Sequence, residues 1–315
     1  MLRAAAVRHV ARAYSVGRFV APPTVRTGLR DDIRRSLAAL HGDYYIVVHG
    51  PRCVGKSRLI DAALAGERGV WSVDVMPGTK AAEIIKCATE HLGVASLLQL
   101  VGFRPIVVLR VVERTYYNAP AGVAAAVKVL TSKHGLRVIV DAEEYSIDDN
   151  VLETTRQCVF WVGEMSRDEL MQIPDVQDAM QELTRNGLDQ AAWQIFGGVP
   201  THYMQADLLA TMQRELRTAL DRIHKFRCKK NVVDDEADML IKKLTGGPVH
   251  RHQLGWWQTN YQRYGVYRKE GDYVVPVNAA TRFALQRGLY NRECFRVPQT
   301  AQDMIDLVGH HEPQQ

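Results

Sequence analysis

The sequence predicts an α/β protein in which a parallel sheet comes first and a largely helical region follows. Short apolar runs of strand length alternate with amphipathic runs of helix length over residues 28–165, and this alternation is typical of a parallel sheet covered on both faces. A loop bounded by glycines joins the first strand to the next helix. Beyond residue 165 helical periodicity dominates, with one hairpin pattern near residue 270. Together these observations predict an α/β core followed by a second, mainly helical region.

The predicted strands are short runs rich in β-branched and aromatic residues, which favour buried strands. The predicted helices combine good helix formers with apolar residues at helical spacing. The predicted strands are 44–48, 69–75, 104–112, 136–141 and 157–163, and the helices between them are 56–65, 79–92 and 121–134.

The loop after the first strand carries the pattern G-x-x-x-x-G-K-[ST], formed by Gly50, Gly55, Lys56 and Ser57. Between a strand and a helix this pattern predicts a phosphate-binding loop, because backbone N–H groups at a helix N-terminus cradle phosphates. Lys56 would reach the β- and γ-phosphates, and the Ser57 hydroxyl would bind Mg²⁺. A glycine-containing turn that only packs is the alternative. The predicted binding residues are Gly50, Pro51, Arg52, Cys53, Val54, Gly55, Lys56, Ser57 and Arg58.

The segment GPRCVGKSRLI, residues 50–60, resembles the loop of archaeal-type ATPases, a branch of the AAA+/STAND P-loop ATPases. Three further segments resemble that family in order along the chain. Arg26 and residues 29–37 resemble the helix that leads into the family's loop, residues 156–160 and 165–169 resemble a strand and the helix after it, and FGGVP at 196–200 resembles a glycine-proline turn. In relatives the glycine-proline turn belongs to a helical lid over the nucleotide base, so the resemblance implies that Pro200 contacts the nucleotide. It also implies ATP and Mg²⁺ as cofactors.

The residues that would catalyse hydrolysis depart from the family pattern. The resemblance implies an acid pair at the end of the third strand, where this sequence has Arg110 and a single acid, Glu113. The fourth strand ends in Asp141, and Glu143 and Glu144 follow closely. Two interpretations stay open: these acids support hydrolysis, or the site binds nucleotide and hydrolyses it slowly or not at all. The candidate catalytic residues are Lys56, Asp141 and Glu113, and the candidate Mg²⁺ ligands are Ser57 and Asp141.

The resemblance implies a helical lid at 166–232 and a winged-helix-like domain at 233–297, and the polar residues 298–315 are expected to form a loose tail. Ser166 and Glu169 form a capping-box pattern, which predicts the start of a helix. Aromatic and basic residues interleave in the winged-helix-like part; this mixture suits RNA and equally suits a small domain that buries its aromatic residues. The predicted helices are 167–182, 188–196, 201–226 and 234–244, and the predicted hairpin is 265–277.

The composition indicates the cellular compartment of the protein and argues against some classes of protein. The chain has 315 residues, 46% of them apolar, and five cysteines without a C-x-x-C pair, a pattern typical of a reducing compartment and not of a disulfide framework or a zinc ribbon. Residues 1–30 contain six arginines and no acid, so residues 1–14 are predicted to be a mitochondrial transit peptide cut before Ser15. A basic arm that stays attached is the alternative. Cleavage would take the formal charge from +5 to +2.

These features together predict a P-loop protein of the mitochondrial matrix that binds ATP with Mg²⁺. If it is active, it couples hydrolysis to a conformational change in a protein partner. The alternative is a non-catalytic nucleotide-binding subunit of a mitochondrial ribonucleoprotein, such as the small ribosomal subunit. The missing acid pair after the third strand favours that alternative, whereas the complete loop supports binding in both cases.

Overall fold

The structure is a computed structural model that describes residues 24–76, 78–92, 104–111, 122–143, 156–227, 234–254, 266–270, 273–291 and 295–309. The predicted transit peptide, Glu113 and Glu144 lie outside the described residues. The chain divides into two compact units, Met1–Gly163 and Glu164–Gln315. The finer division of the second unit into a lid and a winged-helix-like domain stays a prediction.

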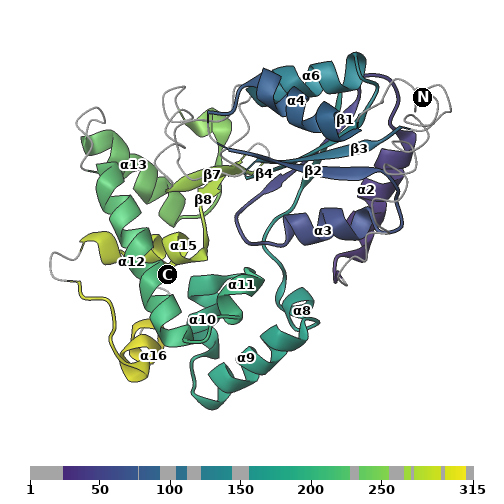
Figure 1. The fold of residues 1–315 in the computed structure, drawn as a ribbon. Coiled ribbons are helices and arrows are strands. Elements are labelled where there is room, and N and C mark those ends of the chain that lie inside the picture. The colour runs from purple at the N-terminus through teal and green to yellow at the C-terminus, as the bar shows by residue number, and fades with distance from the viewer. Residues whose placement is uncertain are drawn as a thin grey trace, which may run out of the picture. The chain divides into compact units, whose positions relative to one another are not determined.

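The first unit contains a five-stranded sheet in the order β2-β3-β4-β1-β5, in which all strands run parallel (Figure 1). All five predicted strands are confirmed. Because β1 lies between β4 and β5, the loop that leaves β1 starts beside the carboxyl end of β4. The strands are β1 (Tyr45–Gly50), β2 (Val70–Val75), β3 (Ile106–Val111), β4 (Arg137–Glu143) and β5 (Gln157–Trp161).

Helices cover both faces of this sheet (Figure 1). The helices α4 (Ala81–Leu92) and α6 (Gly122–Ser132) contact each other over one face, and α2 (Thr27–Ala39) and α3 (Lys56–Ala63) contact each other over the opposite face. The first face buries Val107 and Leu109 of β3, together with Val138 and Val140 of β4, against α4 and α6. Since side chains alternate along a strand, Arg110 and Asp141 point to the face that α3 covers.

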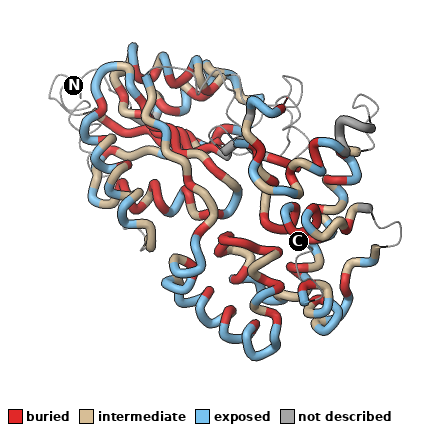
Figure 2. Tube along the Cα trace, turned by 180° about the vertical axis from the view of Figure 1, so that it is seen from behind, coloured by how far each residue is buried: buried red, intermediate tan, exposed pale blue. Residues whose placement is uncertain are grey.

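Figure 2 shows that the strands in the middle of the sheet are buried along most of their length. The four residues from Ile106 to Leu109 are all 0% exposed. A strand buried on both faces is expected to be continuously apolar instead of alternating, and this is the pattern IVVL that β3 carries. The polar residues Arg110 and Asp141 therefore stand out, because each follows such an apolar run at the carboxyl end of its strand.

The second unit consists of helices and a small antiparallel sheet of order β6-β8-β7. The predicted hairpin is confirmed in β7 (Tyr267–Glu270) and β8 (Tyr273–Pro276), and β6 (Val249–His250) pairs with β8. Short 3₁₀ turns occupy Arg251–Gln253 and Leu289–Asn291. The helices are α8 (Arg167–Leu170), α9 (Pro174–Arg185), α10 (Asp189–Phe196), α11 (Pro200–Tyr203), α12 (Leu208–Arg227), α13 (Asp234–Thr245), α15 (Ala279–Gln286) and α16 (Ala301–Gly309).

Two long helices predicted for this unit are each broken in the structure. The predicted helix at 167–182 is split into α8 and α9, because Pro174, which has no N–H to donate, begins a new helix. The capping box at the start of α8 is confirmed. The predicted helix at 201–226 is split between α11 and α12, where the Asp207 carboxylate accepts a 2.8 Å hydrogen bond from Ala210 N, as an N-terminal cap does.

The prediction of a loose tail after residue 297 is wrong for the described residues. Thr300 and Asp303 form a reciprocal pair of side-chain to backbone hydrogen bonds, at 3.1 and 3.2 Å, that begins helix α16. Met304 and Val308, four residues apart, are buried on one face of that helix, which contacts α10. The apolar spacing and the cap together order a segment that its polar composition did not predict to be helical.

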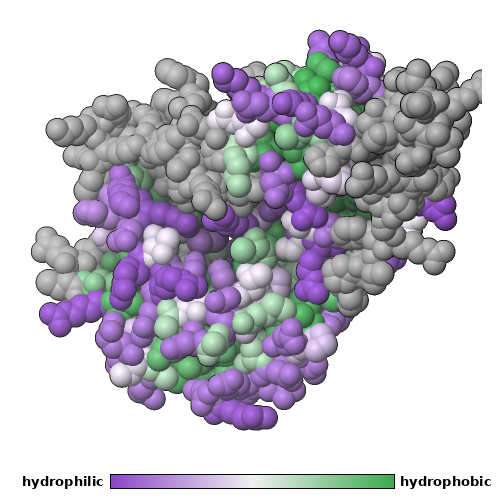
Figure 3. Space-filling view, in the orientation of Figure 1, coloured by the Kyte–Doolittle hydropathy of each residue, from purple (hydrophilic) through white to green (hydrophobic). Residues whose placement is uncertain are grey.

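The described surface is mostly hydrophilic, with small apolar patches between charged side chains (Figure 3). The large exposed hydrophobic residues are spread over several elements and include Tyr44, Val159 and Tyr273; isolated residues of this kind are normal on a protein surface. Within the described part of the chain, no helix combines the length and the apolar character needed to cross a membrane.

Candidate functional site

The loop from Gly50 to Gly55 leaves β1 in a conformation that depends on its glycines. Gly50 has φ +152°, and a Cβ atom there would lie 2.1 Å from the carbonyl oxygen of Val162, so no side chain fits. Gly55 has φ +90° and occupies the N-cap position of α3, a left-handed conformation that glycine adopts without strain. Val162 N donates a 2.8 Å hydrogen bond to His49 O, which fixes the neighbouring segment against the start of the loop.

Lys56 is buried at the first position of α3, with 8% of its surface exposed. Its Nζ donates hydrogen bonds to the carbonyl oxygens of Gly50 (2.9 Å) and Pro51 (2.6 Å). The loop backbone therefore already holds an ammonium group within its curve, at the amino end of a helix that favours anions. This is the arrangement expected of a loop that binds phosphate.

The Ser57 hydroxyl donates a 2.7 Å hydrogen bond to Asp141 Oδ2. Asp141 lies near the carboxyl end of β4, opposite Val48 of the neighbouring strand β1, and is 6% exposed. Burial raises the pKa of Asp141, while the hydrogen bond from Ser57 and the charges of Lys56 and Arg110 act in the opposite direction. A hydroxyl and a carboxylate oxygen side by side are donors that Mg²⁺ prefers, so these two residues fit the ion that the sequence predicts.

Arg110, at the end of β3, forms an ion pair with Asp61 of α3, with 2.7 Å between Nη2 and Oδ1. Burial raises the pKa of Asp61, the charge and hydrogen bond of Arg110 lower it, and the charge of Asp141 raises it. β3 itself, whose sequence is IVVLRV, contains no acid. Arg110 thus occupies the strand end where the family resemblance implies a carboxylate.

His49 precedes the loop and packs edge-on against Trp161 of β5, with 5.0 Å between the ring centroids. Burial and the nearby charge of Lys56 lower the pKa of His49 to about 4. The side chain is therefore neutral near pH 7. It adds no competing positive charge at the base of the loop.

The other predicted site residues are distributed differently. Within the loop, Val54 is buried and Arg52 and Cys53 are exposed; the adjacent Arg58, on α3, is also exposed. Pro200 is buried at the first position of α11 in the second unit. Glu113 and Glu144 fall outside the described residues, so the structure describes Asp141 but not these two acids.

Asp61 and Trp161 were not identified as site residues from the sequence. Asp61 carries a readable signal, because it lies four residues after Ser57 and thus on the same face of α3. Trp161 shows no such signal, since its contact with His49 depends on the pairing of β5 with β1. Among the described residues, no group of three or more histidine, cysteine, aspartate or glutamate side chains gathers as a metal cluster.

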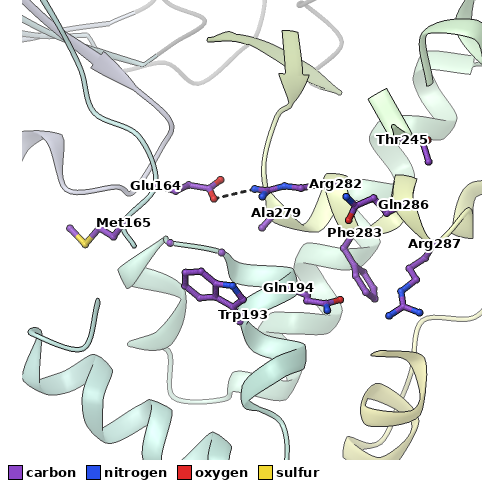
Figure 4. Close-up of a pocket in the computed structure, with 12 residues that line it drawn as sticks. Glu164, Met165, Trp193, Gln194, Thr245, Ala279, Arg282, Phe283, Gln286 and Arg287 are labelled. Carbon is purple, nitrogen blue, oxygen red and sulfur yellow. Dashed lines mark hydrogen bonds and ion pairs between the residues drawn. The ribbon is translucent and has the colours of Figure 1, made fainter. Parts of the chain in front are cut away.

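The second unit contains a cavity of about 740 Å³ between α10 and α15 (Figure 4). Trp193 of α10 and Phe283 of α15 line it together with polar side chains. Arg282 forms an ion pair with Glu164, at 3.3 Å between Nη2 and Oε2, and Arg287 Nη2 donates to Val308 O at 2.6 Å. Both guanidinium groups are thus engaged within the unit, and the residues that line the cavity all belong to the second unit.

Comparisons with known proteins and solved structures identify similar folds. No model of a known protein family matches the chain, and no curated protein matches it. Among solved structures, the Walker-type ATPase of Pyrococcus abyssi is 14% identical, with 86% of this chain and 100% of that chain covered and a TM-score of 0.50. The RuvB Holliday junction branch migration motor of Thermotoga maritima is 12% identical, with 82% of this chain and 95% of that chain covered and a TM-score of 0.37. The replication initiator DnaA bound to AMPPCP and single-stranded DNA is 12% identical, with 92% of this chain and 93% of that chain covered and a TM-score of 0.36. The sheet order and the first of these likenesses show that the chain has the α/β fold of the P-loop NTPase core.

Proposed function

We propose that the protein binds ATP with Mg²⁺ at the loop of the first unit and hydrolyses it, coupling the nucleotide state to a conformational change in a protein partner. The observation that carries this proposal is the 2.7 Å hydrogen bond between Ser57 and Asp141. It places a carboxylate from a second strand beside the loop hydroxyl, which a turn that only packs would not require. The preference for ATP rests on the resemblance of the loop to ATPases.

The residues of the loop and of β4 divide the tasks of binding and hydrolysis in this proposal. Lys56 and the backbone N–H groups of the loop balance negative charge on the β- and γ-phosphates. Ser57 and Asp141 would hold Mg²⁺, which when bound neutralises phosphate charge. In hydrolysis, water forms a bond to the γ-phosphorus, the bond to the bridging oxygen breaks, and ADP keeps that electron pair. Asp141, with Glu113 as the other candidate, orients the water, and the proton released goes to solvent.

A second candidate is a nucleotide-holding subunit without turnover, assembled into a mitochondrial ribonucleoprotein such as the small ribosomal subunit. The position of Arg110 at the end of β3, paired with Asp61, favours this reading. A site with one well-placed acid can bind the nucleotide and gain stability from it, because a ligand that binds only the folded state stabilises that state. We propose the mitochondrial matrix as the location for both candidates, with RNA contact through the second unit as part of the second.

The test uses protein that begins at Ser15, with the variants Lys56→Ala and Asp141→Asn. Matched controls are Lys128→Ala on α6 and Asp178→Asn on α9, which change exposed residues of the same types. Thermal shift with Mg-ATP and Mg-GTP measures binding, and steady-state phosphate release measures turnover.

Mg-ATP should stabilise the parent protein and both controls, but not Lys56→Ala, and turnover should be lost in Asp141→Asn. Stabilisation of the parent without any phosphate release would select the nucleotide-holding subunit. No stabilisation by either nucleotide would overturn both candidates.

A further inference from the structure

Four polar side chains connect helix α3 to the ends of β3 and β4. Ser57 and Asp61 belong to α3, Arg110 to β3 and Asp141 to β4. Ser57 donates to Asp141 at 2.7 Å, and Arg110 pairs with Asp61 at 2.7 Å. The helix is therefore attached to two neighbouring strands by two separate polar contacts, one for each strand.

These four side chains share one small region of the fold. Ser57 and Asp61 are four residues apart, so they lie on the same face of α3. Arg110 and Asp141 are directly opposite each other in the parallel register of β3 and β4, and opposite residues on neighbouring strands point to the same face, with the strands about 4.8 Å apart. Arg110 thus has two carboxylates within reach of its long side chain, Asp61 and Asp141.

The charges of these groups also affect one another. Burial is the largest cause of the raised pKa of both carboxyls, and the charge of Arg110 lowers both pKa values. The charge of Asp141 in turn raises the pKa of Asp61. If the Arg110 guanidinium moved from Asp61 to Asp141, it would neutralise the negative charge that Asp141 presents beside the loop.

We propose that Asp61 is a positioning residue that holds Arg110 away from Asp141 and so keeps Asp141 open to a divalent cation. The proposal rests on the function proposed above, because it concerns the Mg²⁺ ligand of the same site. Without the Asp61 carboxylate, Arg110 would pair with Asp141, and a guanidinium that close to the carboxylate competes with a metal ion. Without Arg110, Asp61 adds an unbalanced negative charge beside the site.

The two single variants therefore have opposite expected effects. Asp61→Asn should raise the Mg²⁺ concentration at half-maximal binding of a fluorescent ATP analogue by about tenfold, the effect of one close charge contact that water largely screens. Arg110→Met should lower that concentration, and Asp61→Asn combined with Arg110→Met should return it close to the parent value. Arg110→Lys keeps the charge and should stay near the parent.

Thermal stability without ligand is measured in parallel, because the ion pair also contributes to the fold. If both single variants only lower the melting temperature and leave the Mg²⁺ midpoint unchanged, or shift it in the same direction, the pair is merely structural and the proposal is overturned. If Arg110→Met does not fold, Arg110→Gln takes its place. The Asp61→Asn variant still shows on its own whether the Mg²⁺ midpoint rises, as the proposal requires. A parent without Mg²⁺-dependent binding overturns the proposed function and this inference together, whereas a responsive parent with no opposed shift overturns this inference only.

Discussion

His49 is a histidine held neutral at the base of the phosphate-loop candidate, and its burial makes the stability of the fold depend on pH. Burial and then the charge of Lys56 lower its pKa to about 4, against about 6.5 in an unfolded chain. Between these values the unfolded state binds more protons than the folded state. The free energy of unfolding should therefore fall as the pH drops from 6.5 to 4, by about 3 kcal/mol from this residue.

Chemical denaturation at a series of pH values between 7 and 4.5 measures this effect. His49→Gln should remove about that much of the acid sensitivity, while His41→Gln, which changes an exposed histidine, should leave the pH dependence of the parent. An unchanged slope in His49→Gln would contradict the prediction.

At the residue scale, the sequence predicted those parts of the site that follow from a local pattern. Gly50, Gly55, Lys56 and Ser57 are fixed by the loop pattern, and the position of Asp141 after an apolar run marked it as a candidate acid. Whether Asp141 is close to the loop depends on which strand neighbours β1, and only the sheet order shows that. The pairing of Arg110 with Asp61 joins residues 49 positions apart, and no local pattern contains it.

At the scale of the elements, Gly198 leaves no space for a side chain. A Cβ atom at Gly198 would lie 1.9 Å from Met165 O and 2.4 Å from Met165 N, and Met165 N also donates a 2.8 Å hydrogen bond to Gly198 O. Because the obstructing atoms are backbone, no side chain can move aside. Gly198→Ala should lower the free energy of unfolding by about 3 kcal/mol, measured by chemical denaturation.

The matched control is Gly309→Ala at the end of α16, where an added Cβ meets nothing within 4 Å. It should leave the stability of the parent within about 0.5 kcal/mol. Equal stability of the two variants would show that the segment at Met165 yields easily and would contradict the prediction.

The helices and strands themselves were largely predictable, and the errors have local causes. Strands buried on both faces carry continuous apolar runs, so β1, β3 and β4 were readable from composition alone. The break before α9 was overlooked although Pro174 signals it, because the apolar spacing continues across the proline. The break before α12 depends on Asp207, and an aspartate inside an amphipathic pattern does not by itself distinguish a cap from an exposed helical position.

At the scale of the whole molecule, the two units differ in how far the sequence predicts their folds. The core of the first unit is built from alternating elements, whose order implies a parallel sheet. The second unit has no comparable repeat, and its packing brings together α10, α12 and α15, which are far apart in the sequence. The helix α16 was predictable in principle from its cap and apolar spacing, but the polar composition of the surrounding tail outweighed both signals.

At the scale of the whole molecule, the charge at the start of the chain predicts where the protein is located in the cell. Residues 1–30 carry six arginines and no acid, and a positively charged segment is drawn across a membrane whose inner side is negative, by about 2.3 kcal/mol per charge per 100 mV. A reporter fused to residues 1–30 should enter mitochondria and be cut before Ser15, as N-terminal sequencing would reveal. Arg3→Glu, Arg8→Glu and Arg12→Glu together should abolish import, whereas Arg18→Glu, which lies after the predicted cut, should allow the same cleavage. A reporter that stays in the cytosol with residues 1–14 attached would instead identify them as a permanent basic arm, and the formal charge of the working protein would then be +5 and not +2.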